Sequence, residues 1–188
     1  MDNHYFVACT LSDEVKETLH NIRQSFLTEE AFKKVTDQAD LHITLSFLGA
    51  VSEQQLNIVC EALDKKIKER QTFQVVFDHI HTFGPKDSPR VWWAGPREST
   101  ELSSLYDCVQ SAVSVIEKGE SRPFRPHVTL AKKWKGEAAT VYRGSLDPVS
   151  AQITEVRVYK IHPGHSPMYS TYQSFQLKES GENNGTAD

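Results

Sequence analysis

The tetrapeptide His-aliphatic-Thr-Leu occurs twice in this chain, once from His42 and once from His127. Each copy lies in a stretch that predicts a β-strand, where residues i and i+2 point to the same face. Each histidine therefore shares a face with its threonine, Thr44 in the first copy and Thr129 in the second. We expect the two pairs to come from the halves of a duplicated fold and to face each other across one cleft.

Two histidines beside one phosphate can divide the work of displacing an oxygen from it. The unperturbed pKa of histidine, about 6.5, lets one ring accept a proton from the attacking water or hydroxyl while the other donates one to the leaving oxygen. The threonine hydroxyls can donate hydrogen bonds to phosphate oxygens, and a nearby cation would stabilise the developing charge. A metal site is the competing interpretation, but the spacing of the histidines matches no zinc pattern. We therefore expect no metal and no cofactor.

The distribution of charge indicates where a phosphate would bind. The 188 residues carry a net charge of −4, so the molecule as a whole is not drawn to nucleic acid. From 121 to 135, however, five basic residues that include Arg125 and Lys132 occur without an acidic one. Such a strip beside the second histidine suits a phosphate-bearing ligand, and a solvated loop is the alternative.

Bulk composition places the chain among ordinary globular proteins. No stretch reaches the roughly 18 consecutive apolar residues that a membrane span needs, and no signal peptide is recognisable. We expect Cys9, Cys60 and Cys108 to be buried free thiols, as in a reducing compartment. The sequence thus predicts a cytoplasmic protein without membrane contact, and a monomer without an obligate protein partner.

Hydrophobic periodicity predicts a mixture of strands and helices without a steady βαβ rhythm, which indicates an α+β fold. We expect a bilobal, internally duplicated fold with two antiparallel sheets lining a central cleft and helices on the outside. One domain should span 1–178, with lobes divided near 85, and 179–188 should form a disordered tail. The predicted helices cover about 13–26, 53–70 and 99–118, and the predicted strands cover 5–11, 41–48, 73–83, 90–94, a stretch after 126, 151–161 and 172–177.

Other histidines and tryptophans are weaker candidates for a site. His79 and His81 share one face of a predicted strand, but no nearby residue completes a site. The segment 162–167 contains two histidines, and we interpret it as a surface turn rather than a border of the cleft. Adjacent Trp92 and Trp93 must face opposite ways in a strand, so one can line the cleft while the other packs in the core.

The two motif segments, LHITLSFLG at 41–49 and RPFRPHVTLA at 122–131, resemble the signature segments of the 2H phosphoesterase superfamily. Within it the chain is most similar to the RNA 2′,3′-cyclic phosphodiesterases, also called 2′-5′ RNA ligase-like proteins. The segments 5–8, 90–95 and 164–169 also fall where such proteins have similar stretches. The resemblance extends over most of the chain, and the paired motifs are its specific part.

The resemblance implies hydrolysis of a 2′,3′-cyclic phosphate, at an RNA end or in a small cyclic nucleotide, to a 2′-phosphate without metal or cofactor. By the same resemblance His42 would donate a proton to the leaving 3′ oxygen, and His127 would activate water. Thr44 and Thr129 would hold the phosphate.

One departure from the family and two alternative functions leave the substrate and the direction of reaction open. Lys132 stands where the family often has arginine, and with Arg125 it would bind substrate; a lysine keeps the charge but loses the planar fork. One alternative is an RNA- or nucleotide-binding module with the same pocket and no useful catalysis, although both His/Thr pairs are present. Another is the reverse reaction, RNA ligation to a 2′-5′ linkage, since the same groups serve both directions.

Overall fold

Helix and strand boundaries follow the periodicity of apolar side chains along the chain. The computed structural model describes residues 3–26, 31–119, 123–136 and 141–180. Within these ranges the α-helices are α1 Asp13–Phe26, α2 Glu53–Ile67 and α3 Thr100–Val113, with 3₁₀ turns η1 Gln38–Asp40 and η2 Ser114–Ile116. The strands are β1 His4–Thr10, β2 Phe32–Val35, β3 His42–Ala50, β4 Phe73–Phe83, β5 Val91–Pro96, β6 Val128–Trp134, β7 Gly144–Ile153, β8 Glu155–Ile161 and β9 Tyr169–Gln176.

A serine side chain caps the start of each of the three α-helices, Ser12 at α1, Ser52 at α2 and Ser99 at α3. Ser52 and Gln55 form a reciprocal capping box at α2, which confirms the predicted start of that helix. The predicted end of the third helix, at 118, is wrong: α3 stops at Val113, and Glu117 adopts the left-handed conformation, with φ 57°. A tighter 3₁₀ turn over 114–116 replaces the last turn of the predicted α-helix. None of the described helices has the length and apolar character needed to cross a membrane.

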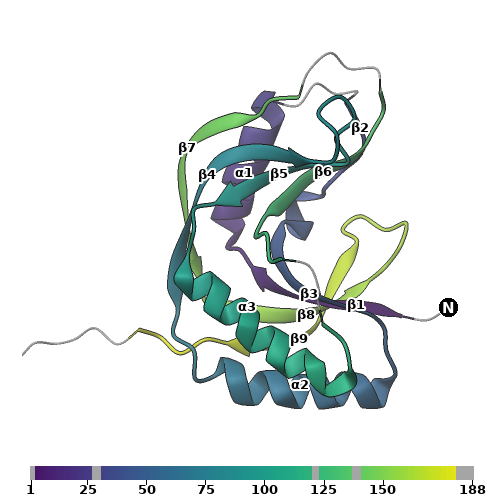
Figure 1. Ribbon diagram of the computed structural model, residues 1–188, viewed down its shortest axis with the longest axis vertical. Coiled ribbons are helices and arrows are strands. Elements are labelled where there is room, and N and C mark those ends of the chain that lie inside the picture. The colour runs from purple at the N-terminus through teal and green to yellow at the C-terminus, as the bar shows by residue number, and fades with distance from the viewer. Residues whose placement is uncertain (1–2, 27–30, 120–122, 137–140, 181–188) are drawn as a thin grey trace, which may run out of the picture.

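All nine described strands belong to one antiparallel sheet, in the order β7-β4-β5-β6-β3-β1-β8-β9, with β2 pairing β6 beside this path (Figure 1). Two halves of the sheet meet at its centre, where β3 and β6 share the single pair Ile43 and Val128. The α+β fold is confirmed, and the two predicted sheets are the halves of this one sheet. The strands β1 and β3 flank α1 in sequence as β5 and β6 flank α3, as a duplicated fold would, although the duplication itself stays a hypothesis.

The helices cover the sheet on the side away from the paired histidines. Helix α3 packs on β3 and on α2, α2 packs on β9, and α1 lies against β7 (Figure 1). One cluster of buried side chains runs through both halves of the sheet, with Trp92, Phe77 and Ile43 among its fully buried members. A second, small cluster on the opposite face centres on Phe6 and Tyr159. The single domain over 1–178 stays a prediction.

Other elements also differ from the sequence interpretation. The predicted strand 151–161 is wrong, because the chain leaves one half of the sheet at Ile153 and enters the other at Glu155. The alternation of apolar and polar residues continues across this break because the segments on both sides are strands, so the sequence pattern does not show the break. The short strand β2 was not predicted, as four residues give too little periodicity. Of the predicted tail, Ser180 donates a hydrogen bond to the Thr72 carbonyl at 2.9 Å, and 181–188 lie outside the described residues.

A β-bulge interrupts β3 directly after the first His-Thr pair. Consecutive residues of β1 pair with Thr44 and Ser46, so Leu45 is an extra residue. Such an insertion turns the residues that follow to the face opposite the one that simple alternation predicts. Ser46 is therefore buried, with 1% exposure, whereas Phe47 lies on the face that carries Thr44 and is 55% exposed.

Strand β6 repeats this bulge after the second His-Thr pair. Consecutive residues of β5 pair with Thr129 and Ala131, so Leu130 is the extra residue. The fifth residue after each histidine, and not the fourth, therefore joins the histidine and threonine on their face. That residue is Phe47 in β3 and Lys132 in β6.

Candidate active site

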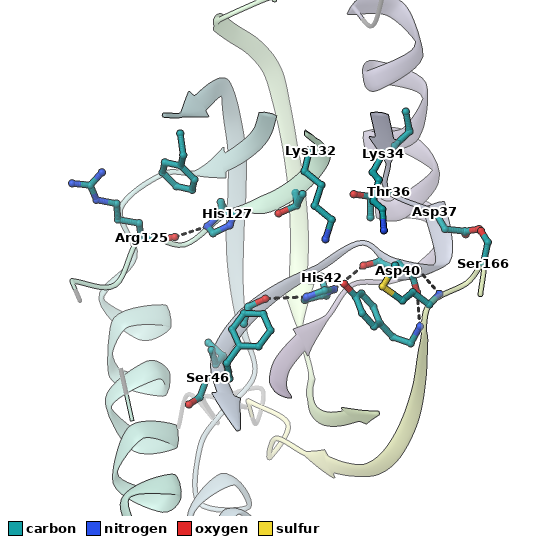
Figure 2. A pocket seen from close by; sticks show the side chains of 18 of the residues that line it. Lys34, Thr36, Asp37, Asp40, His42, Ser46, Arg125, His127, Lys132 and Ser166 are labelled. Atoms are coloured by element: carbon teal, nitrogen blue, oxygen red, sulfur yellow. Dashed lines mark hydrogen bonds between the residues drawn. The ribbon is translucent and has the colours of Figure 1, made fainter. Parts of the chain in front are cut away.

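The two histidines line one cleft of about 850 Å³ above the junction of β3 and β6. A cleft of this size falls within the range of about 300–1,000 Å³ that is usual for ligand sites. Figure 2 shows the side chains of both histidines among those that line it. All six residues that the sequence predicts for the site line this cleft: His42, Thr44, Arg125, His127, Thr129 and Lys132.

A backbone carbonyl two residues earlier holds each imidazole in place. His42 Nδ1 lies 2.6 Å from the carbonyl oxygen of Asp40, and His127 Nδ1 lies 2.7 Å from that of Arg125. Because a carbonyl oxygen can only accept, Nδ1 carries the proton and donates in both bonds. Nε2 of each neutral ring is therefore free of a proton, which is the form that a general base needs.

The first threonine contacts its histidine directly. Thr44 Oγ1 lies 2.9 Å from His42 Nε2, and because Nδ1 carries the ring proton, the hydroxyl donates in this bond. Protonation of Nε2 would reverse the bond and release the hydroxyl hydrogen for another acceptor. Thr129 lines the same cleft from β6. The predicted sharing of one face by histidine and threonine is thus confirmed for the first pair by a direct hydrogen bond.

Aromatic rings cover both imidazoles. The centroid of the Phe6 ring lies 4.8 Å from that of His42, and the centroid of Phe83 lies 4.9 Å from that of His127. These rings exclude water from the side of each imidazole that they cover. Further ring contacts come from Tyr159 and Tyr169 at His42 and from Trp93 at His127.

This burial keeps both histidines neutral in the free protein. Loss of solvent is the largest cause that lowers the pKa of His42, from its usual 6.5 to about 4, against the opposing effect of the Asp40 carbonyl. The positive charges of Lys16 and Lys132 and the neighbouring His127 lower the pKa of His42 further. Burial also lowers the pKa of His127. Both rings thus present an unprotonated Nε2 at neutral pH.

A buried carboxylate, Asp40, ties the loop between β8 and β9 to the segment that holds His42. Its two oxygens accept hydrogen bonds from the backbone N–H groups of Met168 and Tyr169, at 2.7 and 3.1 Å. Asp40 is 7% exposed, and its burial raises the pKa of the carboxyl while the two N–H groups lower it. One residue therefore fixes both an imidazole, through its carbonyl, and a wall of the cleft, through its side chain.

The interpretation of 162–167 as a turn away from the cleft is wrong. Gly164, His165 and Ser166 all line the cleft. Asp37 Oδ2 accepts a hydrogen bond from Ser166 Oγ at 2.6 Å, beside the bonds that Asp40 makes to the same loop. These hydrogen bonds, to partners about 130 residues away in sequence, hold the loop at the cleft, and no local sequence pattern indicates them.

Lysine side chains gather at the end of the cleft nearest β2. Lys34 and Lys132 are direct cross-strand partners, and both line the cleft together with Lys33. Burial is the largest cause that lowers the pKa of Lys132, and the charge of Lys34 lowers it further. Figure 2 shows Lys34 and Lys132 directed toward His42, whereas the guanidinium of Arg125 points away. Sequence reasoning missed Lys34, and substrate binding by the Arg125 side chain stays a prediction.

The opposite end of the cleft is aromatic. Tyr106 of α3 and Phe124 stack with ring centroids 4.0 Å apart and planes inclined by 12°. Both line the cleft, as does Phe47, the exposed ring that the bulge of β3 turns to this face. Sequence reasoning missed Phe47 because strict alternation would place Ser46 there.

The remaining sequence candidates lie outside the cleft or in the core. Trp92 is fully buried and Trp93 contacts His127, as the opposite faces of a strand predict. His79 and His81 both contact Trp93 and so share a face, and neither lines the cleft. The three cysteines are buried free thiols. In the part of the chain that the structure describes, no group of three or more His, Cys, Asp or Glu could hold a metal ion.

The lowered pKa of His42 gives a directly measurable pH dependence. By NMR we expect the His42 ring to titrate near pH 4, well below 6.5 in the unfolded chain. The unfolded chain then binds the proton first, so the folded protein loses stability as the pH falls from about 6.5 to about 4. His42→Ala should flatten this part of the stability profile. A titration midpoint of His42 at or above pH 6.5 would contradict the burial of its ring described above.

Comparisons with known proteins agree with this fold and cleft. Residues 10–93 match the family model described as LigT like phosphoesterase. The RNA 2′,3′-cyclic phosphodiesterase of Bacillus subtilis is 31% identical over 181 residues, 93% of this chain and 96% of that protein. The RNA 2′,3′-cyclic phosphodiesterase of Geobacillus stearothermophilus is 31% identical over 180 residues, which are 93% of this chain. This chain spans only 57% of the length of that relative.

Solved structures resemble the chain over nearly its whole length. The crystal structure of E. coli LigT complexed with 3′-AMP matches with a TM-score of 0.81 at 24% identity, covering 95% of this chain and 99% of that one. At this identity the likeness concerns the fold alone. Together with the sequence match to the B. subtilis protein, it leads to one conclusion: the chain belongs to the LigT-like phosphoesterase family.

Proposed function

We propose that this protein hydrolyses 2′,3′-cyclic phosphate ends of RNA to 2′-phosphates by general acid–base catalysis between His42 and His127, without a metal ion. The observation that carries the proposal is the matched pair of hydrogen bonds from Nδ1 to backbone carbonyls. These bonds leave Nε2 of each ring unprotonated in one cleft, with Thr44 donating to that of His42. The names of the bacillary relatives, both RNA 2′,3′-cyclic phosphodiesterases, support the substrate class.

The reaction is a displacement at phosphorus by water. His127 Nε2 accepts a proton from water as the water oxygen bonds to phosphorus. The bond between phosphorus and the 3′ oxygen breaks, and Nε2–H of protonated His42 gives its proton to that oxygen. The products are a 2′-phosphate and a free 3′-hydroxyl, and proton exchange with solvent restores both rings.

Binding of the anionic substrate favours protonation of His42, the proposed acid. Burial keeps His42 neutral in the free protein, but an anionic phosphate beside the ring favours the charged form and raises its pKa. The rate should then follow a bell-shaped pH profile, since one ring must be charged and the other neutral. Hydrolysis by this route needs only the two imidazoles and water.

Neighbouring side chains hold the phosphate. Once Nε2 of His42 is protonated, Thr44 no longer donates to it and can donate to a non-bridging oxygen. Thr129 would do the same from the other strand, and Lys132 would stabilise the charge that develops in the transition state. The base of the terminal nucleotide would stack at the aromatic end, on the exposed ring of Phe47.

The test uses a short RNA that ends in a 2′,3′-cyclic phosphate, incubated with the protein in EDTA. We expect a linear 2′-phosphate product, heavier by one water, identified by mass and by sensitivity to phosphatase. General acid–base catalysis contributes about 10²–10⁴-fold, so His42→Ala and His127→Ala should each lower kcat/KM by at least about 10²-fold. His4→Ala, at an exposed position on β1, is the matched control and should retain activity.

Circular dichroism of each variant separates loss of chemistry from loss of fold. Near-normal rates in either cleft variant would show that the two-histidine mechanism is wrong. Binding of the RNA without turnover in the wild type would indicate a binding module instead. A joined product, when an RNA with a 5′-hydroxyl is added, would indicate the ligation direction.

The assignment of acid and base has its own test, a substrate whose leaving group needs no proton. A 3′-deoxynucleoside 2′-(4-nitrophenyl) phosphate releases nitrophenolate, which leaves as the anion. If His42 is the acid, His42→Ala should hydrolyse this ester at a rate close to that of the wild type, while His127→Ala stays slow. The opposite pattern would reverse the two roles.

A further inference from the structure

Two cations on one face of helix α1 are buried, which is unusual for such side chains. Lys16 and Arg23 lie about two helical turns apart and are 8% and 3% exposed. A buried charge is costly unless it is paired, yet in the described parts of the chain neither forms an ion pair with a carboxylate. Neither side chain lines the cleft. The groups that these cations do contact therefore indicate their role.

Both cations donate hydrogen bonds to carbonyl oxygens of the segment that leads to His42. Arg23 Nη1 donates to the carbonyl of Thr36, and Lys16 Nζ donates to that of Ala39 at 2.9 Å. Ala39 belongs to the 3₁₀ turn η1, which packs on α1. A hydrogen bond from a charged donor is stronger than one between neutral groups. Helix α1 therefore fixes this segment from outside the cleft.

The bond from Lys16 lies one residue from the carbonyl that holds the imidazole. Ala39 directly precedes Asp40, whose carbonyl accepts the hydrogen bond from His42 Nδ1 at 2.6 Å (Figure 2). Because each peptide unit is planar, only the two backbone dihedral angles of Asp40 separate the carbonyl that Lys16 holds from the one that holds the ring. The bond from Arg23 lies three residues earlier in the chain. Of the two cations, Lys16 is therefore the one placed to control the orientation of the ring.

The charge of Lys16 also acts on the imidazole. Burial is the largest cause that lowers the pKa of His42, and the charge of Lys16 lowers it further. Burial also lowers the pKa of the Lys16 ammonium, while the carboxylates of Asp13 and Asp40 raise it and so favour its charged form. Other ionisable groups that act on the ammonium or on the ring are Arg157 of β8, Lys132 of β6 and His127, which precedes β6.

We propose that Lys16 is a positioning residue for His42 and acts on it through the turn that ends at Asp40. The bond to Ala39 holds this turn in the shape that directs the Asp40 carbonyl to Nδ1 of the ring. The ammonium charge keeps the ring neutral until an anionic substrate binds. This inference rests on the proposed function for the role of His42 as the acid, but the state of the ring can be measured without turnover.

NMR of the free protein measures both effects on the ring. Lys16→Met keeps a side chain of similar length and removes the charge and the donor. Without the cation the titration midpoint of His42 should rise from near pH 4 by about 0.5–1 pH unit. Because a looser turn secures the Nδ1 bond less well, the nitrogen chemical shifts of the neutral imidazole should show some Nε2–H tautomer. Lys16→Arg keeps the charge and a donor, so it should retain the wild-type midpoint and tautomer.

Two further variants separate this role from a general loosening of the fold. Arg23→Met removes the other buried cation of α1 and should leave the midpoint and tautomer of His42 unchanged, because the carbonyl that it frees lies farther from the ring along the chain. Lys65→Met, an equal change of charge on the exposed surface of α2, should also leave them unchanged. Circular dichroism shows whether each variant is folded, and Lys16→Gln replaces the methionine variant if that one does not fold.

Turnover of the RNA with a 2′,3′-cyclic phosphate end gives the kinetic readout. Small misplacements of a catalytic group can cost up to about 10²-fold in rate, so Lys16→Met should lower kcat about tenfold. The value of KM should change little, because Lys16 does not line the cleft. Lys16→Arg should restore most of kcat.

An unchanged midpoint and tautomer of His42 in folded Lys16→Met would overturn the positioning role. An equal change in Arg23→Met would also overturn it, since the effect would then belong to the whole segment. Neither result touches the proposed function, which is judged by turnover of the wild type. Conversely, a wild type without turnover would remove the proposed function, while the expected change in the Lys16→Met spectrum would still show that this lysine controls the ring.

Discussion

The hydrogen bonds from Nδ1 of each histidine to a backbone carbonyl are the constraint on which the site depends. They fix the tautomer as well as the orientation, so that Nε2 of His42 and of His127 is the atom available to a ligand. A carbonyl two residues back along the chain is present in any sequence, and the site needs only a backbone that turns there. The 3₁₀ turn that ends at Asp40 supplies this backbone for the first histidine.

The central junction of the sheet brings the two locked rings together. Strands β3 and β6 meet through one residue pair, and beyond it they diverge to leave the cleft open. The matched bulges at Leu45 and Leu130 then give each strand a third cleft-facing residue. One is an aromatic ring and the other a cation, so similar halves provide different chemistry at the two ends.

Sequence predicted the parts of this site that depend on local pattern. The His-Thr spacing within a strand is a period-two signal, and it placed all four residues in one cleft. Phe47 was not predicted because a β-bulge interrupts the period-two pattern of β3. Lys34 was not predicted because β2 is too short to show such a pattern. The role of Asp40 also escaped, since its partners at 168 and 169 lie far along the chain. The longer strands and helices were located well, but the end of α3, the start of β7 and the change from one half of the sheet to the other at Thr154 were not.

The central claim is that His42 and His127 act on one phosphate held between them. A crystal structure of the protein with a nucleoside 2′-phosphate, the proposed product, tests it most directly. The account predicts phosphate oxygens, or the 3′-hydroxyl, at about 2.6–3.2 Å from Nε2 of both rings. The Nδ1 bonds to the carbonyls of Asp40 and Arg125 should remain. A phosphate bound elsewhere, or one that contacts a single imidazole while the other ring turns away, would contradict the account.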